Sequence, residues 1–305
     1  MGWRSAAAGD AGCLAELASE ASGSTVSPGD AAAFLETWRV EIDDEGTAAV
    51  AVLPPADGHA RGYGAWWVHR DSAQHRDVVD RLIHLASSVP GLSVLQISLP
   101  DGQTVDEPRF ERAHPLWTMV HDGTTWPQQA PVLPVPLRVG RWSDVVPGEF
   151  ETAYAQSYRD QRVVEPHGAE AWALLARGDA FAAELGVLAV TPEEQVAGFV
   201  LGFRQGRRGV ELGPIGTVPA WRGRGVCSAL LASVLMYCRE NGLAPVTLTV
   251  DGESPTHAQN LYLKHGFRVT ERLTAYQVRL QPRRRRRVDS GSVGSTGSDA
   301  AWRSW

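Results

Sequence analysis

One stretch decides the fold of this chain: residues 210–228, with the sequence VELGPIGTVPAWRGRGVCS. Its first nine residues, 210–218, are mostly apolar, as in a buried strand, and Pro219, which favours a turn, follows them. The basic loop Arg222–Cys227 follows, and the amphipathic segment Ser228–Asn241 after it has helical spacing. The order strand, glycine-bearing turn and helix directs backbone amides and a helix N-terminus at one point. The stretch therefore predicts a site for a pyrophosphate-bearing ligand.

The loop also has the residue types that such a ligand needs. Gly223 and Gly225 allow the backbone to approach a phosphate closely, and Arg222 and Arg224 add positive charge. We expect the pyrophosphate-binding groups to come from one run: Arg222, Gly223, Arg224, Gly225, Val226, Cys227 and Ser228. The loop lacks the Gly-Lys-Ser/Thr of a P-loop, and it lacks a three-glycine dinucleotide fingerprint followed by an acidic residue. Both of those nucleotide sites are excluded.

The loop resembles the Arg/Gln-x-x-Gly-x-Gly/Ala signature of the GNAT acyltransferase superfamily, which binds the pyrophosphate of coenzyme A. Later motifs occur in the same order and spacing: the apolar strand 246–250, the segment 254–262, and the Tyr-x-x-x-Gly-Phe pattern of residues 262–267. Two positions depart from the superfamily pattern. Cys227 stands where Gly or Ala is usual, and Ser254 or Pro255 replaces an asparagine. Ser254 is still expected to cap the later helix, with Pro255 at its first position.

The resemblance implies transfer of an acetyl group from acetyl-CoA to an amine, with no metal required. Such a reaction needs a base for the amine, hydrogen-bond donors for the oxyanion and a proton for the leaving thiolate. By position in the pattern, Glu211 is implied as the base or a substrate-binding group and Tyr262 as the acid. The backbone of Ile215, Gly216 and Thr217 is implied to bind the pantetheine arm, and Ser254 is also placed at the cofactor.

Each of these side chains also has a structural interpretation. Glu211 lies in an apolar strand, where burial would raise its pKa, but a solvent-facing carboxylate balanced by Arg207 or Arg208 fits the same pattern. Tyr262 could be a core residue that uses its ring for packing. A helix N-terminus lowers a thiol pKa, yet the implied position of Cys227 below the pyrophosphate favours packing over nucleophilic chemistry. His257 and His265 are interpreted as surface residues, and Ser228 as a possible helix cap.

Composition and charge limit the class of protein. The net charge of −6 gives no footprint for nucleic acid, and three cysteines are too few for a disulfide framework or a zinc site. The first residues lack the apolar run of a signal peptide, and no segment has the ~18 uncharged apolar residues of a membrane-spanning helix. We expect a cytoplasmic protein that acts on a small-molecule amine and contacts neither nucleic acid nor membrane. The oligomeric state stays open.

A length of 305 residues suggests two domains. The order helix, three strands, helix, strand, helix and strand is predicted before residue 121, and the same order recurs after residue 137. The expected division is a degenerate GNAT-like domain at residues 1–125, a proline-rich linker at 126–136, a catalytic domain at 137–282, and a disordered basic and Ser-Gly tail at 283–305. The expected fold class is α+β: tandem GNAT folds, each with a central, mostly antiparallel twisted sheet flanked by helices.

The N-terminal copy is expected to bind no coenzyme A, because its strand-to-helix junction at residues 69–76 contains no glycine. An unrelated α+β domain is the alternative for this half. Its last elements are expected to be a short helix at 107–113 and a strand at 116–121. A strand at 275–280 is expected to close the C-terminal domain, and the acceptor amine is expected beside helices at 150–162 and 169–177.

Three other functions remain open. Among tandem members of the superfamily the chain is similar to mycothiol synthase, which acetylates a cysteine amine on a thiol-sugar conjugate, so the same reaction is one alternative. A non-catalytic acyl-CoA-binding regulatory module would keep the loop but not Glu211 and Tyr262. Acetylation of a protein would need an open peptide groove, which a covering N-terminal domain would obstruct.

Overall fold

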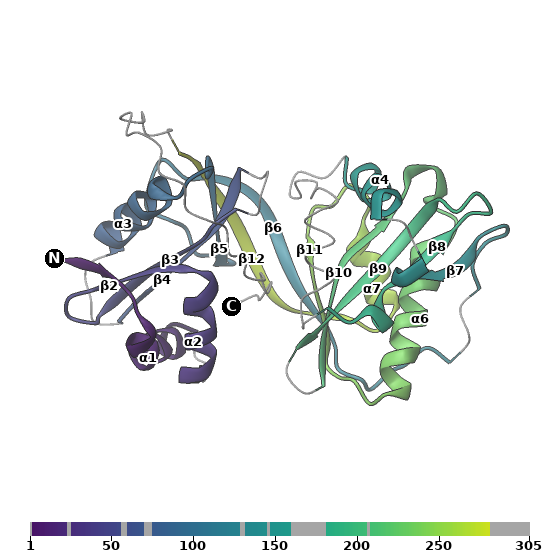
Figure 1. Ribbon diagram of the computed structural model, residues 1–305, viewed down its shortest axis with the longest axis horizontal. Coiled ribbons are helices and arrows are strands. Elements are labelled where there is room, and N and C mark those ends of the chain that lie inside the picture. The colour runs from purple at the N-terminus through teal and green to yellow at the C-terminus, as the bar shows by residue number, and fades with distance from the viewer. Residues whose placement is uncertain are drawn as a thin grey trace, which may run out of the picture. The chain divides into compact units, whose positions relative to one another are not determined.

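The structure is a computed structural model that describes residues 2–22, 26–55, 60–69, 75–128, 132–144, 147–159, 181–205 and 208–280 (Figure 1). The chain forms two compact units. The first unit contains the described residues up to Ala113 and those from Ala275 onward, and the second contains His114–Thr274. The expected helix at 169–177 and the expected tail at 283–305 lie outside the described residues.

The first unit is a sheet covered by helices on both faces. Its strands are β1 (Trp3–Ser5), β2 (Arg39–Asp43), β3 (Ala48–Leu53), β4 (Arg61–Val68) and β5 (Val94–Pro100), and its α-helices are α1 (Ala11–Ser22), α2 (Pro28–Thr37) and α3 (His75–Ser88). Successive β3 residues alternate between the two faces. Ala48, Val50 and Val52 pack in the core that contains α3, whereas Ala49 and Ala51 pack against α1 and α2. Ser27 caps α2 by accepting a hydrogen bond from the Asp30 amide, as expected from Pro28 at the first helical position.

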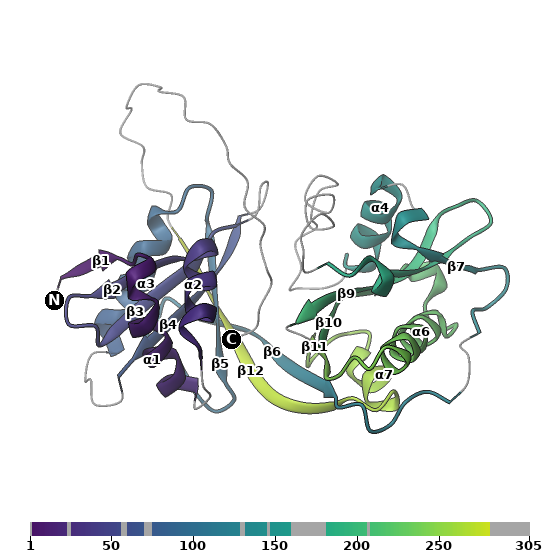
Figure 2. The same cartoon turned by 60° about the horizontal axis from the view of Figure 1, so that its bottom comes forward.

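The second unit has the same layered plan. Its strands are β6 (Glu111–His121), β7 (Arg138–Arg141), β8 (Val187–Val190), β9 (Val196–Gln205), β10 (Gly209–Thr217), β11 (Val246–Asp251) and β12 (Arg268–Arg279), and its α-helices are α4 (Pro147–Ser157), α6 (Val226–Glu240) and α7 (Ala258–Lys264). Helices α6 and α7 lie on one side of the sheet and α4 lies on the other (Figure 2). Along β9, Ala197 and Val200 face the α6 core, and Phe199 and Leu201 face the α4 core.

The two units repeat one connection. In the first unit β4 leads through α3 to β5, and β4 and β5 pair in parallel. In the second unit β10 leads through α6 to β11, and these strands also pair in parallel. The other pairings within the units are antiparallel wherever a register is defined, for example between β3 and β4 or between β9 and β10. This shared plan confirms the expected α+β class with mostly antiparallel sheets flanked by helices.

Two strands join a different unit from the one expected. Most of β6 belongs to the second unit, where residues 116–121 pair antiparallel with β11. The second half of β12 belongs to the first unit. Tyr276 and Val278 lie in the core of that unit, and the side-chain amide of Gln277 donates to the side-chain oxygen of Gln96, in β5, at 2.8 Å. The expectation that 116–121 closes the N-terminal half and that 275–280 closes the C-terminal domain was therefore wrong. The expected helix at 107–113 was also wrong, because β6 begins at Glu111.

Within the described ranges, no helix is long and apolar enough to cross a membrane.

The strand exchange can be tested with Val278→Asp. Val278 is buried in the core of the first unit, so an unpaired carboxylate there should lower the free energy of unfolding of that unit by at least ~4 kcal/mol. Hydrogen exchange should then show lost protection in β3–β5 and α3, with β8–β10 still protected. Arg279→Asp, at the exposed neighbouring position, is the matched control. Loss of protection in β8–β10 with β3–β5 intact would contradict the exchange.

Candidate active site

The site forms where two parallel strands separate. Strands β10 and β11 pair at only two positions, Val210 with Val246 and Glu211 with Thr247. Beyond Glu211, β10 carries a bulge: the pairing with β9 passes from Leu212 opposite Gly202 to Ile215 opposite Val200. Two β10 residues, Gly213 and Pro214, therefore oppose one β9 residue. Proline suits a bulge because it has no amide hydrogen for the ladder.

The ladder shows which backbone groups of β10 face the gap left by β11. The Val218 amide donates to the Ala197 carbonyl of β9 at 3.0 Å. Because backbone groups alternate in direction along an antiparallel strand, Gly216 also faces β9, whereas Ile215 and Thr217 face away from it. The backbone of Ile215 and Thr217 is thus directed to the side on which β11 no longer pairs. Gly216, the third residue expected to bind the pantetheine arm, has its backbone groups on the β9 side.

A tyrosine side chain meets the backbone of Ile215. The Tyr158 hydroxyl donates to the Ile215 carbonyl at 2.8 Å and accepts from the Ile215 amide at 3.1 Å. Tyr158 follows the last residue of α4, and its ring lies 4.6 Å from the Tyr154 ring and 6.4 Å from the Phe199 ring. One hydroxyl therefore provides both partners that a neighbouring strand would have given to Ile215.

Packing leaves no room for a side chain at Gly216. A Cβ atom there would come within 2.4 Å of the Phe199 ring, which belongs to the α4 core. On the neighbouring strand, Gly198 lies opposite Thr217 and close to α6, because an added Cβ there would meet the Val226 side chain at 2.8 Å. The end of β10 is consequently fixed from both faces.

The loop before α6 presents free space above left-handed glycines. Gly223 and Gly225 have φ angles of +73° and +82°, which L side chains rarely adopt, and an added Cβ at either would have no atom within 4 Å. Gly225 is the N-cap of α6, so the amides of Val226, Cys227 and Ser228 begin the helix. The first amides of a helix have no partner inside it and carry partial positive charge. This geometry fits a phosphate.

The two loop arginines are placed differently. The Arg224 side chain is exposed and lies over the Trp221 ring, with 5.0 Å between its guanidinium carbon and the ring centroid. The Arg222 guanidinium turns inward and donates to the Ser157 carbonyl at 2.8 Å and to the Thr217 carbonyl at 3.2 Å. Its backbone amide donates to the Pro219 carbonyl. Arg222 therefore ties the end of α4 to the end of β10.

Glu211 lies at the start of the gap on the α4 face of the sheet. It pairs with Phe203, and paired residues of an antiparallel ladder share a face. The Gln205 side chain donates to the Glu211 carboxylate at 2.7 Å. Burial raises the pKa of the Glu211 carboxyl, and the hydrogen bond from Gln205 opposes that shift. Of its two alternative partners, Arg207 lies outside the described residues and Arg208 is exposed.

Uncharged groups that are buried or half-buried surround the other end of the gap. Tyr262, in α7, is buried with its ring at the edge of Phe267, and burial raises the pKa of its phenol. The Cys227 thiol lies against the Thr217 hydroxyl, and burial raises the pKa of this thiol to about 12. Nearby Cys227 also raises the pKa of both Tyr158 and Tyr262, so the three groups share one neighbourhood. At neutral pH all three keep their protons, which is the opposite of an activated thiolate.

Three local expectations differ from the structure. Ser228 does not cap α6: its hydroxyl is 2.8 Å from His265 Nε2, and Gly225 takes the cap position. His265 is half-buried, and burial and nearby His121 lower its pKa, so it is not a surface histidine. Ser254 does not cap α7, which begins at Ala258 after His257; its buried hydroxyl lies 2.9 Å from the Thr256 hydroxyl in a turn.

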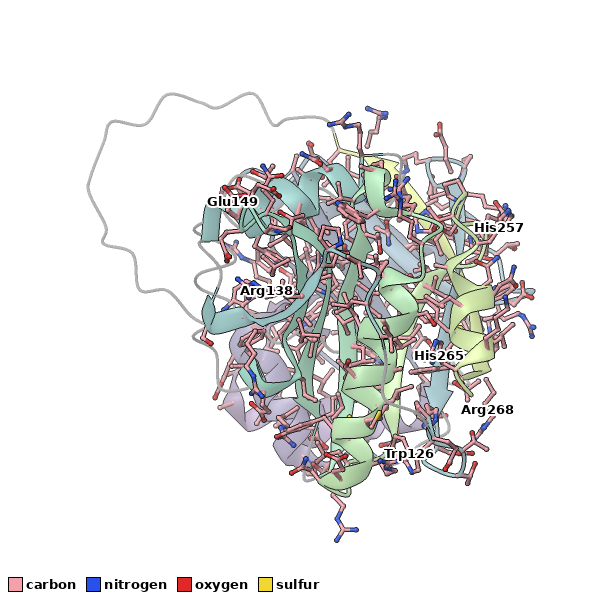
Figure 3. The ribbon with its side chains drawn as sticks, turned by 90° about the vertical axis from the view of Figure 1, so that its right-hand side faces the viewer. Trp126, Arg138, Glu149, His257, His265 and Arg268 are labelled. Atoms are coloured by element: carbon pink, nitrogen blue, oxygen red, sulfur yellow. The ribbon has the colours of Figure 1, made fainter. Side chains whose placement is uncertain are left out.

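Side chains at the two ends of α7 have different surroundings. His257 and His265 flank α7 as its N-cap and C-cap residues, and Figure 3 shows them well separated along the helix. His265 lies on the side of Trp126, whose ring packs 4.6 Å from His121. The His265 end adjoins the first turn of α6 through Ser228.

Sequence reasoning missed the roles of Tyr158, Gln205 and the Arg222 side chain. Gln205 had a usable signal, because a short hairpin pairs it with Gly209 and so makes it a diagonal neighbour of Glu211 on the same face. Tyr158 and the contact of Arg222 with Ser157 had none, since the partners are backbone groups 57 and 65 residues away.

Comparison with known proteins places these elements in a described protein family. A family model described as the acetyltransferase (GNAT) family matches residues 149–267, which include α4, β8–β11, α6 and α7. Residues 149–267 are a GNAT acetyltransferase domain. This match supports a GNAT-type acyltransferase activity for that domain, and the GNAT family uses an acyl-CoA co-substrate. No curated protein matches the chain.

Solved structures extend the fold likeness beyond the GNAT domain. A GCN5-related N-acetyltransferase from Sphaerobacter thermophilus superposes with a TM-score of 0.73 at 21% identity, covering 92% of this chain and 96% of that one. A tandem GNAT protein from the clavulanic acid biosynthesis pathway has a TM-score of 0.63 at 15% identity, covering 92% and 99%. A glucosamine N-acetyltransferase region of a fungal β-N-acetylglucosaminidase has a TM-score of 0.65 at 12% identity, covering 90% of this chain and 38% of that one. At these identities the likeness is one of fold, and it includes the N-terminal half.

The different roles of the loop arginines can be tested with Arg222→Ala. Because two backbone carbonyls lose a charged donor, we expect the free energy of unfolding to fall by about 2 kcal/mol. Arg224→Ala is the matched control in the same GNAT loop and should cost less than ~1 kcal/mol, since it loses only an exposed contact with Trp221. Urea unfolding of both variants makes the comparison. Equal small losses would contradict the inward role of Arg222.

Proposed function

We propose that the GNAT domain transfers an acetyl group from acetyl-CoA to the primary amine of a small molecule. The observation that carries this proposal is the gap beside β10, with the backbone of Ile215 and Thr217 directed into it and the open start of α6 at its end. The pantetheine arm is an extended amide chain, which suits strand groups that face a gap left by a neighbouring strand. The pyrophosphate suits the amides of residues 223–228. Described residues therefore fit both parts of the co-substrate.

Glu211 is proposed to act on the amine through water. Four residues separate it from Ile215, and an extended strand rises ~3.3 Å per residue, so the two Cα atoms are up to ~13 Å apart. A carboxylate at that range reaches the attacking amine through a bridging water more readily than directly. The raised pKa of Glu211 makes it a better proton acceptor than an ordinary carboxylate.

Tyr262 is proposed to assist the leaving thiolate. Its buried phenol keeps its proton at neutral pH, so it can donate a hydrogen bond to the sulfur as the carbon–sulfur bond breaks. The Cys227 thiol takes no part in this scheme, because it too stays protonated. The reaction is then a direct attack of the amine on the thioester, with no covalent enzyme intermediate.

The identity of the acceptor separates this proposal from its alternatives. A mycothiol synthase would use the amine of a cysteine residue on a thiol-sugar conjugate, and it shares every step above. A regulatory acyl-CoA-binding module would bind the same co-substrate and not turn it over. The pairing of Glu211 with Gln205 and the burial of Tyr262 favour catalysis, because binding alone needs neither group.

The proposal is tested by calorimetry with acetyl-CoA and by release of free thiol from it. The wild type should bind and hydrolyse it slowly. Gly225→Trp should abolish binding, because a bulky side chain at the left-handed N-cap fills the space above the loop. Tyr262→Phe should bind and release thiol more slowly. Absence of wild-type binding refutes the proposal, and binding without any thiol release supports the regulatory alternative.

The pH dependence of thiol release tests Glu211. Only the ionised carboxylate accepts a proton, so the rate should fall as pH falls through the pKa of Glu211, which lies above the ordinary value of 4.5. Glu211→Gln should lose this limb of the profile and slow the reaction by roughly 10²-fold or more. Gln205→Ala, which removes the opposing hydrogen bond, should move the limb to higher pH. An unchanged profile in Glu211→Gln would exclude the base role.

The same residue makes a prediction about stability. The folded state raises the pKa of Glu211, because burial favours the neutral carboxyl group. The free energy of unfolding is therefore highest below the unfolded pKa of 4.5, where the carboxyl is neutral, and it falls as pH rises through the folded value. At pH 8 the buried carboxylate therefore destabilises the fold. Glu211→Gln should have a higher melting temperature than the wild type at pH 8 and no advantage at pH 4. Equal melting temperatures at pH 8 would show that burial imposes no cost on this carboxylate.

A further inference from the structure

The Tyr158 hydroxyl occupies a distinctive position in the GNAT domain. It is bound to both backbone groups of Ile215 at the point where β10 has lost its partner strand. Its ring is held by Tyr154 and Phe199, and Phe199 in turn lies against Gly216. The phenol is thus directed into the gap that the proposed function assigns to the acyl-CoA thioester.

The hydrogen-bond inventory of the phenol shows what a thioester would change. A phenolic oxygen accepts and also donates one proton, and here it accepts from the Ile215 amide and donates to the Ile215 carbonyl. A thioester carbonyl oxygen only accepts, so it can replace the phenol as the partner of the Ile215 amide. The phenol then lacks a donor, and its proton can turn from the Ile215 carbonyl to the second lone pair of the thioester oxygen.

We propose that Tyr158 is a catalytic hydrogen-bond donor, which together with the Ile215 amide binds the thioester oxygen of acyl-CoA. The proposal rests on the proposed function of the site and adds a group to it. Two donors from different elements, β10 and the residue after α4, would then converge on one oxygen. Donors held in place by packing stabilise an oxyanion without reorganising during the reaction.

The step balances without any further reactant. The amine nitrogen, or water during hydrolysis, forms a bond to the carbonyl carbon, and the carbonyl π electrons move to oxygen. The Ile215 N–H and the Tyr158 O–H donate to that oxyanion. Its electrons then re-form the carbonyl, and the carbon–sulfur bond breaks. The nucleophile's proton passes to Glu211 through water. Tyr262 donates its proton to the departing thiolate and regains one from solvent. Tyr158 keeps its proton throughout, in keeping with its raised pKa.

The test uses Tyr158→Phe, which keeps the ring and removes the hydroxyl. Infrared difference spectra are recorded with acetyl-CoA carrying ¹³C at the thioester carbonyl. In the wild type, the bound carbonyl stretch should lie below its frequency in water, because two donors polarise it. In Tyr158→Phe the shift should be smaller. Acetyl-CoA affinity should stay within about threefold, and thiol release should be roughly 100-fold slower, as for loss of one oxyanion donor.

Tyr154→Phe is the matched control, because it removes a hydroxyl from the adjacent ring of the same aromatic cluster. Its carbonyl frequency should equal that of the wild type. Circular dichroism melting of each variant shows that it is folded. An unchanged frequency and rate in Tyr158→Phe overturn the role of Tyr158 and leave the proposed function standing. Tighter binding with faster thiol release also overturns it, since Tyr158 would then only obstruct the site. Absence of acetyl-CoA binding by the wild type removes the proposed function and this inference together.

Discussion

The structure of the GNAT domain depends on the loss of pairing between β10 and β11 after Glu211. Buried backbone groups need partners, so a strand that loses its neighbour must find others. The bulge at Gly213 and Pro214 keeps β10 attached to β9, and it turns the backbone of Ile215 and Thr217 to the unpaired side. Tyr158 satisfies Ile215, and Arg222 satisfies the Thr217 carbonyl. The features proposed to bind acyl-CoA all follow from this separation.

The same contacts connect opposite faces of the sheet. α4 lies on one face and α6 on the other, yet Arg222, at the start of the α6 loop, donates to the carbonyl of Ser157 at the end of α4. Tyr158, the next residue after Ser157, adds a second contact through its hydrogen bond with Ile215. The end of α4, where the acceptor amine is expected, is therefore fastened to the strand and loop proposed for the co-substrate. Displacing the Tyr158 hydroxyl would affect both sides of the site at once.

Local sequence signals predicted most of the elements, whereas long-range partners lay beyond them. The glycines at 223 and 225 indicated a loop whose backbone can approach a ligand closely, and both have the positive φ angles that few other residues adopt. The isolated carboxylate of Glu211 indicated a buried acid with a raised pKa. In contrast, alternation in β6 and β12 shows which side chains are buried, but it does not say which sheet a strand joins. Arg222 was read as a phosphate ligand because its charge is visible in sequence, while the carbonyls it binds are not.

The central claim is that the unpaired end of β10 and the start of α6 together bind acyl-CoA. Its most direct test is a titration of the ¹⁵N-labelled protein with acetyl-CoA, followed through backbone amide resonances. The amides of Ile215, Thr217 and residues 223–228 should shift most, and those of β3 and β4 in the first unit should stay unchanged. Saturable binding that leaves the amides of Ile215, Thr217 and the loop unperturbed would contradict the account.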